Sequence, residues 1–339
     1  MSRRKSAAKG VVIQANKPVL KITIPTMIEK EGIYTGPSES DFKSVQDMQY
    51  ETMLKGNVSV VYPEREMVDL SFEELHEEFS RRAELRAKIE RKEYDVAIEI
   101  QTDRPIAIGW FADTHIAGAD LDYDRLKWEV DEIRRNPYMR VLLGGDLVDG
   151  FCWNPAQFGD VGNLDEQHLY LHKMLDYMGR DKILAGVMGS HEKWARRTGI
   201  DSYNDIRRNI PIFDGIGVVN LWVNDVNYRG VIAHELKGHS YINPNHQQKR
   251  FVMENGRYDF VLSAHTHTGA EQSQYIGNKK SVFLSGKTFK RTDDFLDTKG
   301  FTRKGEDSLG TNWIIFSHDK FMMRTMSSTA EAIETMGMI

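Results

Sequence analysis

Residues 106–115 have the sequence IAIGWFADTH, in which a six-residue apolar run leads into an aspartate and a histidine two positions apart. Similar runs recur along the chain, and each ends in ionisable residues: VLLGGDLVD at 141–149, ILAGVMGSHE at 183–192, VIAH at 231–234 and VLSAHTH at 261–267. Short apolar runs rich in β-branched and aromatic residues are typical of buried strands. We therefore expect five strands that each deliver acidic or histidine side chains at the carboxyl end.

Two amphipathic stretches lie between these strands, at residues 122–135 and 165–178, and the first stops before Pro137. Further short strands are expected at residues 96–100, 218–223, 281–284 and 312–316. The alternation of strands with helices predicts an α/β domain whose central strands are covered on both faces. Because ligands bind at the carboxyl ends of the strands in such sheets, the charged groups should converge in space.

The residue types at these strand ends suit a metal site. An aspartate can bridge two ions through its two oxygens, and imidazole with carboxylate favours Mn, Fe, Zn, Ni or Co over Ca or Mg. Each motif alone is more often structural; a lone Gly-Asp-x-x-Asp, for example, is usually a turn or a helix N-cap. Six of the eleven histidines fall at or just beyond predicted strand ends: His115, His191, His234, His239, His265 and His267. Random placement would not concentrate them so, and the complete set indicates a metal centre.

The composition excludes several classes of protein. The 339 residues include 45 basic and 50 acidic side chains, a formal net charge of −5, so the chain lacks the overall charge of a nucleic-acid binder. Cys152 is the only cysteine, which excludes an intramolecular disulfide and a cysteine-rich zinc module. No apolar run approaches the roughly 18 residues of a membrane span, and none near the N-terminus is long enough for a signal peptide. These features predict a soluble, cytoplasmic protein with no membrane partner.

The order of the motifs resembles the calcineurin-like metallophosphoesterase superfamily. The resemblance spans about residues 104–317 and rests on Asp-x-His at 113–115, Gly-Asp-x-x-Asp at 145–149, Gly-Ser-His-Glu at 189–192, His234 and His-x-His at 265–267. It implies a four-layered α/β/β/α sandwich with a two-metal site at the sheet edge. Neighbouring stretches, such as Asp-Arg-Pro-Ile at 103–106 and Tyr-Asp-Phe at 258–260, are closest to phosphoesterases of tailed bacteriophages, which implies a location in the host cytoplasm.

The resemblance also implies a role for each site residue. One ion would be held by Asp113, His115 and His267, Asp146 would bridge, and the second ion would be held by His234, His265 and Ser190. His191 would steady the transferring phosphoryl group or protonate the leaving oxygen, while Asp149 and Glu192 would orient their neighbours. The cofactors would be two divalent metal ions, with Mn preferred to Fe, Zn, Ni or Co.

Three positions depart from the family pattern or stay open. Ser190 stands where the family usually has an Asn ligand, so it would bind through water, or the second ion would bind more weakly. Ala264 replaces the usual Gly before the last His-x-His, a mild change if its φ is ordinary. His234 directly follows its strand and is preferred to His239 as the ligand; His239 and His246 would then line the substrate pocket.

Residues 1–94 differ in character from the rest and form a predicted N-terminal extension. They contain a basic arm, a strand-like stretch at 20–25, an irregular stretch with a small helix near 41–54, and a helix over 71–92 that opens with a capping box of Ser71 and Glu74. That helix either packs on the main domain or contacts DNA or a second copy. Residues 95–327 form the predicted phosphoesterase domain, and residues 328–339 a short helix or tail.

The predicted activity is hydrolysis of a phosphate ester by hydroxide bound at the metals, with Asp146 and His191 as catalytic residues. A phage context favours DNA or nucleotides, and hence a nuclease or nucleotide phosphodiesterase. Nearby basic and aromatic residues form either a nucleic-acid surface or a solvated rim with core aromatics: Lys193, Arg196, Arg197, Lys287, Lys290, Arg291, Trp153, Trp194 and Tyr241. The alternatives are a phosphomonoesterase or protein phosphatase, and a catalytically weak metal-binding scaffold. Residues 1–94 are also a candidate docking module for DNA or a partner, and the identity of any protein partner stays open.

Overall fold

A computed structural model describes residues 19–23, 71–89, 95–118, 120–150, 161–197, 199, 201–238, 240, 242–276, 278–292 and 306–338. The chain divides into two compact units, one of residues 1–26 with 93–339 and one of residues 27–92. The first unit contains both β-sheets and the predicted site. In the second unit the structure describes one helix, α2 (Phe72–Ile89).

Among the described residues, one sheet has six strands in the order β13-β12-β3-β4-β5-β6. These strands are β3 (Ile106–Phe111), β4 (Met139–Leu143), β5 (Ile183–Val187), β6 (Ile212–Phe213), β12 (Asn312–Phe316) and β13 (Met323–Met326). Strands β3 to β6 run parallel, whereas β12 is antiparallel to both β3 and β13. Every residue of β3, β4 and β5 is buried, as expected for parallel strands covered on both faces.

The other sheet has seven strands in the part of the chain that the structure describes, in the order β1-β2-β7-β8-β9-β11-β10. These strands are β1 (Val19–Thr23), β2 (Asp95–Gln101), β7 (Ile216–Val223), β8 (Val226–Ala233), β9 (Phe260–Ser263), β10 (Glu271–Ile276) and β11 (Lys279–Ser285). The β7–β8 and β10–β11 pairs are antiparallel, and the other neighbours are parallel. In β2 and β7, buried residues alternate with more exposed ones, so only one face of these strands lies on the core.

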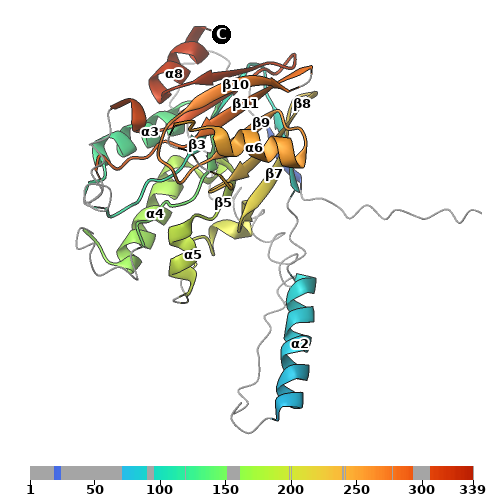
Figure 1. Ribbon diagram of the computed structural model, residues 1–339. Helices are drawn as coiled ribbons and strands as arrows, with labels where there is room; N and C mark the ends of the chain where they lie inside the picture. The colour runs from blue at the N-terminus through green and yellow to red at the C-terminus, as the bar shows by residue number, and fades with distance from the viewer. Residues whose placement is uncertain are drawn as a thin grey trace, which may run out of the picture. The chain divides into compact units, whose positions relative to one another are not determined.

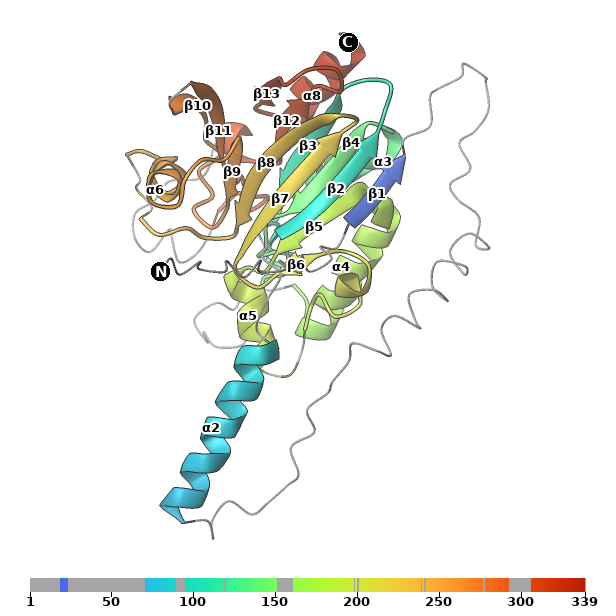
Figure 2. The same cartoon turned by 90° about the vertical axis from the view of Figure 1, so that its right-hand side faces the viewer.

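Helices cover the outer faces of the two sheets. On the six-stranded sheet, α3 (Tyr123–Arg135) contacts β4 and packs against α4 (Leu164–Met178), and α8 (Thr329–Met338) contacts β3, β12 and β13. On the seven-stranded sheet, α6 (His246–Asn255) contacts β9. Figures 1 and 2 show the two sheets between these helices, with α5 (Ser190–Arg197) following β5. The predicted α/β/β/α sandwich is confirmed.

The core lies between the sheets and draws on both of them. Trp110, Trp313, Phe260 and Phe316 belong to one buried cluster, and burying each such side chain contributes about 2–3 kcal/mol. The indole Nε1 of Trp110 in β3 donates to the carbonyl of Ser263 in β9, at 2.9 Å. This bond fixes the end of β9 against β3. Both strands lead directly into predicted metal ligands.

The hairpin of β7 and β8 is longer than the sequence suggests, because polar residues occupy its outer face. Residues 218–223 and 230–233 were expected as separate strands, whereas the pair extends over Ile216–Val223 and Val226–Ala233 with a two-residue turn. Asn224 in that turn has φ +51, a conformation that favours Asn and Gly. Its side-chain amide donates to the carbonyls of Thr102 and His318 and accepts the Thr102 amide, which fixes the turn against the end of β2.

The capping box predicted for the N-terminal extension is present. The Ser71 amide donates to Glu74 Oε2, and the Glu74 amide donates to Ser71 Oγ. The predicted helix near 41–54 lies outside the described residues, and the contacts expected of α2 stay predictions. Strand β1 pairs with β2, so these five residues of the predicted extension are part of the seven-stranded sheet. In the described part of the chain, no helix is long and apolar enough to cross a membrane.

Candidate metal centre

The predicted ligands meet where β3, β4, β8 and β9 end, and most of them have a strained backbone. Seven non-glycine residues with positive φ occur in the described part of the chain: Asp113, His115, Ala117, Asp146, Asn224, His265 and His267. Five of these seven are predicted ligands. A left-handed conformation costs a non-glycine residue about 1–2 kcal/mol, and such residues cluster at functional sites.

Two glycines allow the loops after β4 and β5 to approach each other. A Cβ atom on Gly189 would lie 2.1 Å from Oδ1 of Asp146, and a Cβ on Gly145 would lie 2.4 Å from the amide nitrogen of Gly189. Gly145 also has φ +83. The glycines that precede Asp146 and Ser190 are therefore required by this close approach, which brings the second and third motifs together.

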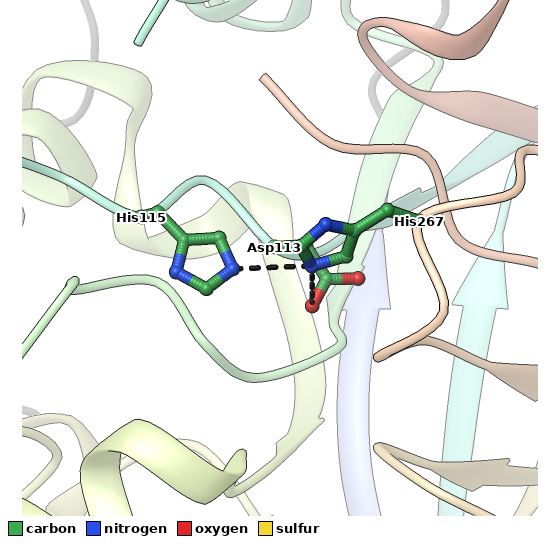
Figure 3. Close-up of side chains that lie close together, drawn as sticks. All are labelled: Asp113, His115 and His267. Atoms are coloured by element: carbon green, nitrogen blue, oxygen red, sulfur yellow. Dashed lines mark hydrogen bonds and ion pairs between the residues drawn. The ribbon is translucent and has the colours of Figure 1, made fainter. Parts of the chain in front are cut away.

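The first group of ligands consists of Asp113, His115 and His267. His267 Nε2 lies 3.2 Å from His115 Nε2 and 3.3 Å from Asp113 Oδ1, and Figure 3 shows the three side chains pointing toward one another. Asp113 Oδ2 accepts the backbone N–H of His265, which joins this group to the second one. Two imidazole nitrogens and a carboxylate oxygen at these distances form one face of a cation site.

The second group consists of Asp146, His234 and His265. His234 Nε2 lies 3.0 Å from Asp146 Oδ2, while His234 Nδ1 donates to the carbonyl of Gly144 at 2.8 Å. Because that carbonyl can only accept, Nδ1 carries a proton and Nε2 is the atom presented to an ion. The structure thus brings six predicted ligands into two adjoining groups.

Divalent cations fit these residues. Asp113 Oδ1 and His234 Nε2 are buried and make no hydrogen bond with the part of the chain that the structure describes, and buried polar atoms of this kind are rare unless an ion or water satisfies them. Both atoms face the other ligands of their group. The donor set of imidazole nitrogens and carboxylate oxygens favours transition metals, as the sequence predicts.

The charges of the ligands depend on burial and on one another. Burial raises the pKa of Asp113. Burial, together with His191 and His267, holds the pKa of His115 well below its usual value, so this imidazole is neutral and able to bind a metal. Burial alone would lower the pKa of His234, but the carboxylates of Asp146 and Asp113 outweigh it and raise the pKa to about 10. A cation at this position has to displace that proton.

Asp149 and Glu192 orient the ligands. Asp149 Oδ1 accepts from His115 Nδ1 at 2.9 Å, which leaves His115 Nε2 facing the first group. Glu192 accepts the backbone N–H groups of Asp146, Leu147 and Gly189, at 2.9, 2.6 and 2.9 Å. These bonds hold the loops after β4 and β5 in register. A third cluster of ligand types, His115, Asp149 and His191, is accounted for by this hydrogen-bonded network rather than by a further ion.

The remaining predicted site residues have distinct positions. Ser190 is half-buried at the first residue of α5, and His246 is exposed at the start of α6. Ala264 is buried and its φ is not in the left-handed region, so it replaces glycine without strain. His239, Tyr241 and Trp153 lie outside the described residues, and the choice of His234 over His239 stays a prediction.

Of the basic residues near the motifs, Lys193, Arg196 and Arg291 are exposed as the sequence suggests, whereas two lysines are not. Lys287 and Lys290 are buried, so the prediction of a solvated position is wrong for both. The exposed Arg196 lies between Asp201 and Asp214, at 3.6 and 3.3 Å. Lys193 is exposed on α5. Two contributions that sequence patterns did not reveal come from backbone carbonyls: Gly144 binds His234, and the carbonyl of Asp113 accepts the Thr288 hydroxyl at 2.8 Å.

Residues 106–269 match the calcineurin-like phosphoesterase family. The matched segment contains every predicted metal ligand together with His191, Asp149 and Glu192, and it supports the superfamily inferred from the motifs. No match was found among curated proteins. The closer resemblance to bacteriophage phosphoesterases finds no support in these comparisons.

Several solved structures resemble the chain at low identity. Vacuolar protein sorting 29 from Cryptosporidium parvum is 12% identical with a TM-score of 0.36, over 66% of this chain and 97% of that one. The zinc complex of Vps29 from Entamoeba histolytica is 11% identical with a TM-score of 0.34, over 65% and 97% of the two chains. The calcineurin-like phosphoesterase YfkN from Bacillus subtilis is 12% identical with a TM-score of 0.36, over 66% and 90%.

Proposed function

We propose that this chain is a metal-dependent phosphoric ester hydrolase that uses two divalent ions. The observation that carries the proposal is the pair of adjoining ligand groups, built from five strained residues and His234 in a segment that matches the calcineurin-like phosphoesterases. Asp113, His115 and His267 would hold one ion, and His234, His265 and Ser190 the other, with Asp146 between them. Bound ions would supply positive charge to the phosphoryl oxygens and lower the pKa of water.

His191 is the proposed catalytic residue that does not bind metal. Its Nδ1 donates to the carbonyl of Asp149, so Nε2 faces the ligands, 3.8 Å from Asp146 Oδ2. At this position Nε2 can donate a hydrogen bond to the transferring phosphoryl group or hold the proton that the leaving oxygen takes up. Asp146 orients His191 in turn, because Asp146 Oδ1 accepts the His191 backbone N–H at 2.8 Å.

The proposed substrates are phosphodiesters of nucleic acids or nucleotides. Support comes from the indole of Trp194, whose ring centroid lies 4.7 Å from that of His191 and which is half-buried beside the site. An aromatic face there can stack on a base. Because Lys287 and Lys290 are buried and Arg196 is ion-paired, less positive charge is accessible to a polyanion than the sequence suggested. This part of the proposal therefore rests on Trp194 and Lys193. A cytoplasmic location, in a host cell for a phage-encoded chain, belongs to the same proposal.

The test is hydrolysis of bis-para-nitrophenyl phosphate and para-nitrophenyl phosphate after reloading with Mn, with metal content measured on the same sample. Wild type is compared with Asp146→Ala, which should lose turnover and metal, and with His172→Ala, a histidine of α4 outside the ligand groups. A preference for the diester supports the proposed substrate class, and a preference for the monoester favours a phosphomonoesterase. Two bound ions with no turnover on either compound would favour a scaffold. A wild-type protein that binds no metal would refute the proposal.

A further inference from the structure

Lys290 places a positive charge beside the metal centre without exposure to solvent. Its side chain is 9% exposed, and Nζ lies 3.4 Å from Oδ1 of Asp149, which is itself buried. The same oxygen accepts from His115 Nδ1 at 2.9 Å. Lys290, Asp149 and His115 therefore form a chain of contacts that ends at a ligand of the first group.

The backbone around Lys290 is fixed to the site. The carbonyl of Asp113 accepts both the Thr288 hydroxyl, at 2.8 Å, and the amide of Phe289. The amide of Lys290 donates to Thr288 Oγ1, and Lys290 pairs with Leu121 in an isolated bridge. The stem of Lys290 lies beside Gly118, where an added Cβ would be 3.2 Å from Lys290 Cε. These contacts fix the position of the Lys290 ammonium group beside the site.

We propose that Lys290 is a positioning residue for the ion held by Asp113, His115 and His267, acting through Asp149; this inference rests on the proposed function. A buried carboxylate needs a counter-charge, and the ammonium group supplies one on the oxygen that binds His115. With its carboxylate held in this orientation, Asp149 keeps the Nδ1 proton of His115, so Nε2 faces the ion. Without the ammonium group, the buried carboxylate of Asp149 rotates toward another hydrogen-bond donor, and His115 is no longer held in its orientation.

Two effects of a nearby cation oppose each other here. A lysine close to a metal ion repels it, and its removal would strengthen binding on that ground alone. Asp149 lies between Lys290 and His115, however, so the ammonium charge is largely balanced by the carboxylate. Groups that orient a ligating histidine typically contribute 10- to 100-fold to metal affinity. We expect the lower end of that range, about tenfold, because Lys290 acts on His115 through Asp149.

Lys287 provides a matched control. It is also buried, at 3% exposure, and follows the same strand β11. Its stem lies against Gly269, and its charged neighbours include Glu129, Arg125 and Glu271. Replacing either lysine by methionine keeps a flexible apolar side chain and removes a buried charge, but only Lys290 contacts Asp149. The unfolding temperature of both metal-free variants measures the packing effect separately.

The experiment is calorimetric titration of the chelator-stripped, full-length protein with Mn. Wild type should bind two ions; Lys290→Met should bind one of them about tenfold more weakly, and Lys287→Met should match wild type. The same substitution in the His265→Ala background, where only the first group is intact, should weaken the remaining ion. In the His267→Ala background, where the first group is incomplete, Lys290→Met should not change the affinity for the remaining ion. If Lys290→Met does not fold, Lys290→Gln is titrated in the same way.

A double-mutant cycle tests whether the effect passes through Asp149. Adding Lys290→Met to Asp149→Asn should not weaken binding further. Unchanged affinity in Lys290→Met and Lys290→Gln, or full additivity with Asp149→Asn, would overturn the inference. A wild-type protein that binds no Mn would instead refute the proposed function, so the two failures are distinguishable.

Discussion

His191 is held on several sides by neighbouring residues. Its backbone N–H donates to Asp146 Oδ1, its Nδ1 donates to the Asp149 carbonyl, and its ring lies edge-on to His115 with centroids 4.7 Å apart. Trp194 lies beside it at an interplanar angle of 34°. A ring restrained in this way presents Nε2 in one fixed direction, which is what catalysis by proton transfer requires.

His191→Ala should lower turnover of the diester substrate about 10²- to 10⁴-fold, the usual contribution of a general acid or base. Both ions should stay bound, because His191 lies outside the two ligand groups that we assign to them. Steady-state kinetics and metal analysis on the same preparation measure the two quantities. Wild-type turnover in His191→Ala would show that the catalytic role belongs to another residue.

The ligands could be predicted from sequence, and so could Asp149 and Glu192 as the groups that orient them, but the contact of Lys290 with Asp149 could not. Asp113, His115, Asp146 and the later histidines directly follow apolar strands, and the carboxyl ends of parallel strands meet at one edge. Lys290 is 141 positions from Asp149 in the chain, and no local pattern links the two. Its burial also contradicts the usual expectation for a lysine.

At the level of secondary structure, Glu192 joins two loops from the third residue of α5. Its Oε2 accepts the amides of Asp146 and Gly189, and its Oε1 accepts the amide of Leu147. All three donors belong to the loops after β4 and β5, so a single buried carboxylate sets the spacing of Asp146 and His191. Both oxygens act as acceptors.

Glu192→Gln should therefore lower the free energy of unfolding by about 2–4 kcal/mol and weaken metal binding. The amide NH₂ of glutamine has to face at least one backbone N–H, which leaves buried donors without an acceptor. Urea unfolding in the presence of chelator and Mn titration measure the two effects. Glu166→Gln, in the exposed capping box of α4, is the control. Unchanged stability and affinity in Glu192→Gln would contradict this account of the loops.

A second buried carboxylate makes the packing of α3 sensitive to pH. Burial raises the pKa of Glu129 to about 7, although Thr311 and Arg125 oppose the rise. Because the folded protein binds this proton more tightly than the unfolded chain, the stabilising contribution is complete below pH 4.5 and is lost as the pH rises through 7. The total change is about 3 kcal/mol.

Glu129→Gln should remove that dependence. As the pH rises from 4.5 to 8, the unfolding free energy of the wild type should fall by about 3 kcal/mol relative to that of the variant. Urea unfolding of metal-free protein at these pH values gives the difference directly. Glu132→Gln, on the same helix but partly exposed beside Arg135, should show no comparable shift. A flat difference for Glu129→Gln would contradict the burial argument.

Long apolar strands and capped helices were predictable, whereas short or polar elements were not. The helix at 122–135 matches α3, and the strand at 106–111 matches β3, because their periodicity and ends are explicit in the sequence. Strand β10 is mostly polar and exposed, β6 has two residues, and α5 begins at the serine of the third motif. Pairing with β11 and β5, rather than local preference, determines β10 and β6.

At the level of the whole molecule, the unit of residues 27–92 is inserted between two adjacent strands of one sheet. β1 and β2 are parallel neighbours, yet the chain leaves the sheet after the first and returns only at the second. Parallel strands need a connection of at least about a dozen residues to run back along the strand. The inserted unit supplies that connection.

Replacing residues 27–92 with a flexible linker of about fifteen residues should leave the first unit folded and its metal content unchanged, because the linker still spans the return path. Thermal unfolding and metal analysis test this outcome. Deleting residues 1–94 should instead expose the edge of β2 and promote self-association, which sedimentation would detect. Loss of metal in the linker variant would show that residues 27–92 support the site directly.

The strand order of the seven-stranded sheet also determines when neighbouring strands can pair during synthesis on the ribosome. β1 and β2 form only a two-stranded pair, which is marginal in water by itself, until their next neighbour β7 is made. About 115 residues separate the end of β2 at Gln101 from the start of β7 at Ile216. At about 5–20 residues per second, the wait is roughly 6 to 23 s. The nascent chain therefore carries an uncovered edge of β2 after the first three sequence motifs have been synthesised, and this edge is covered when the β7–β8 hairpin pairs with β2.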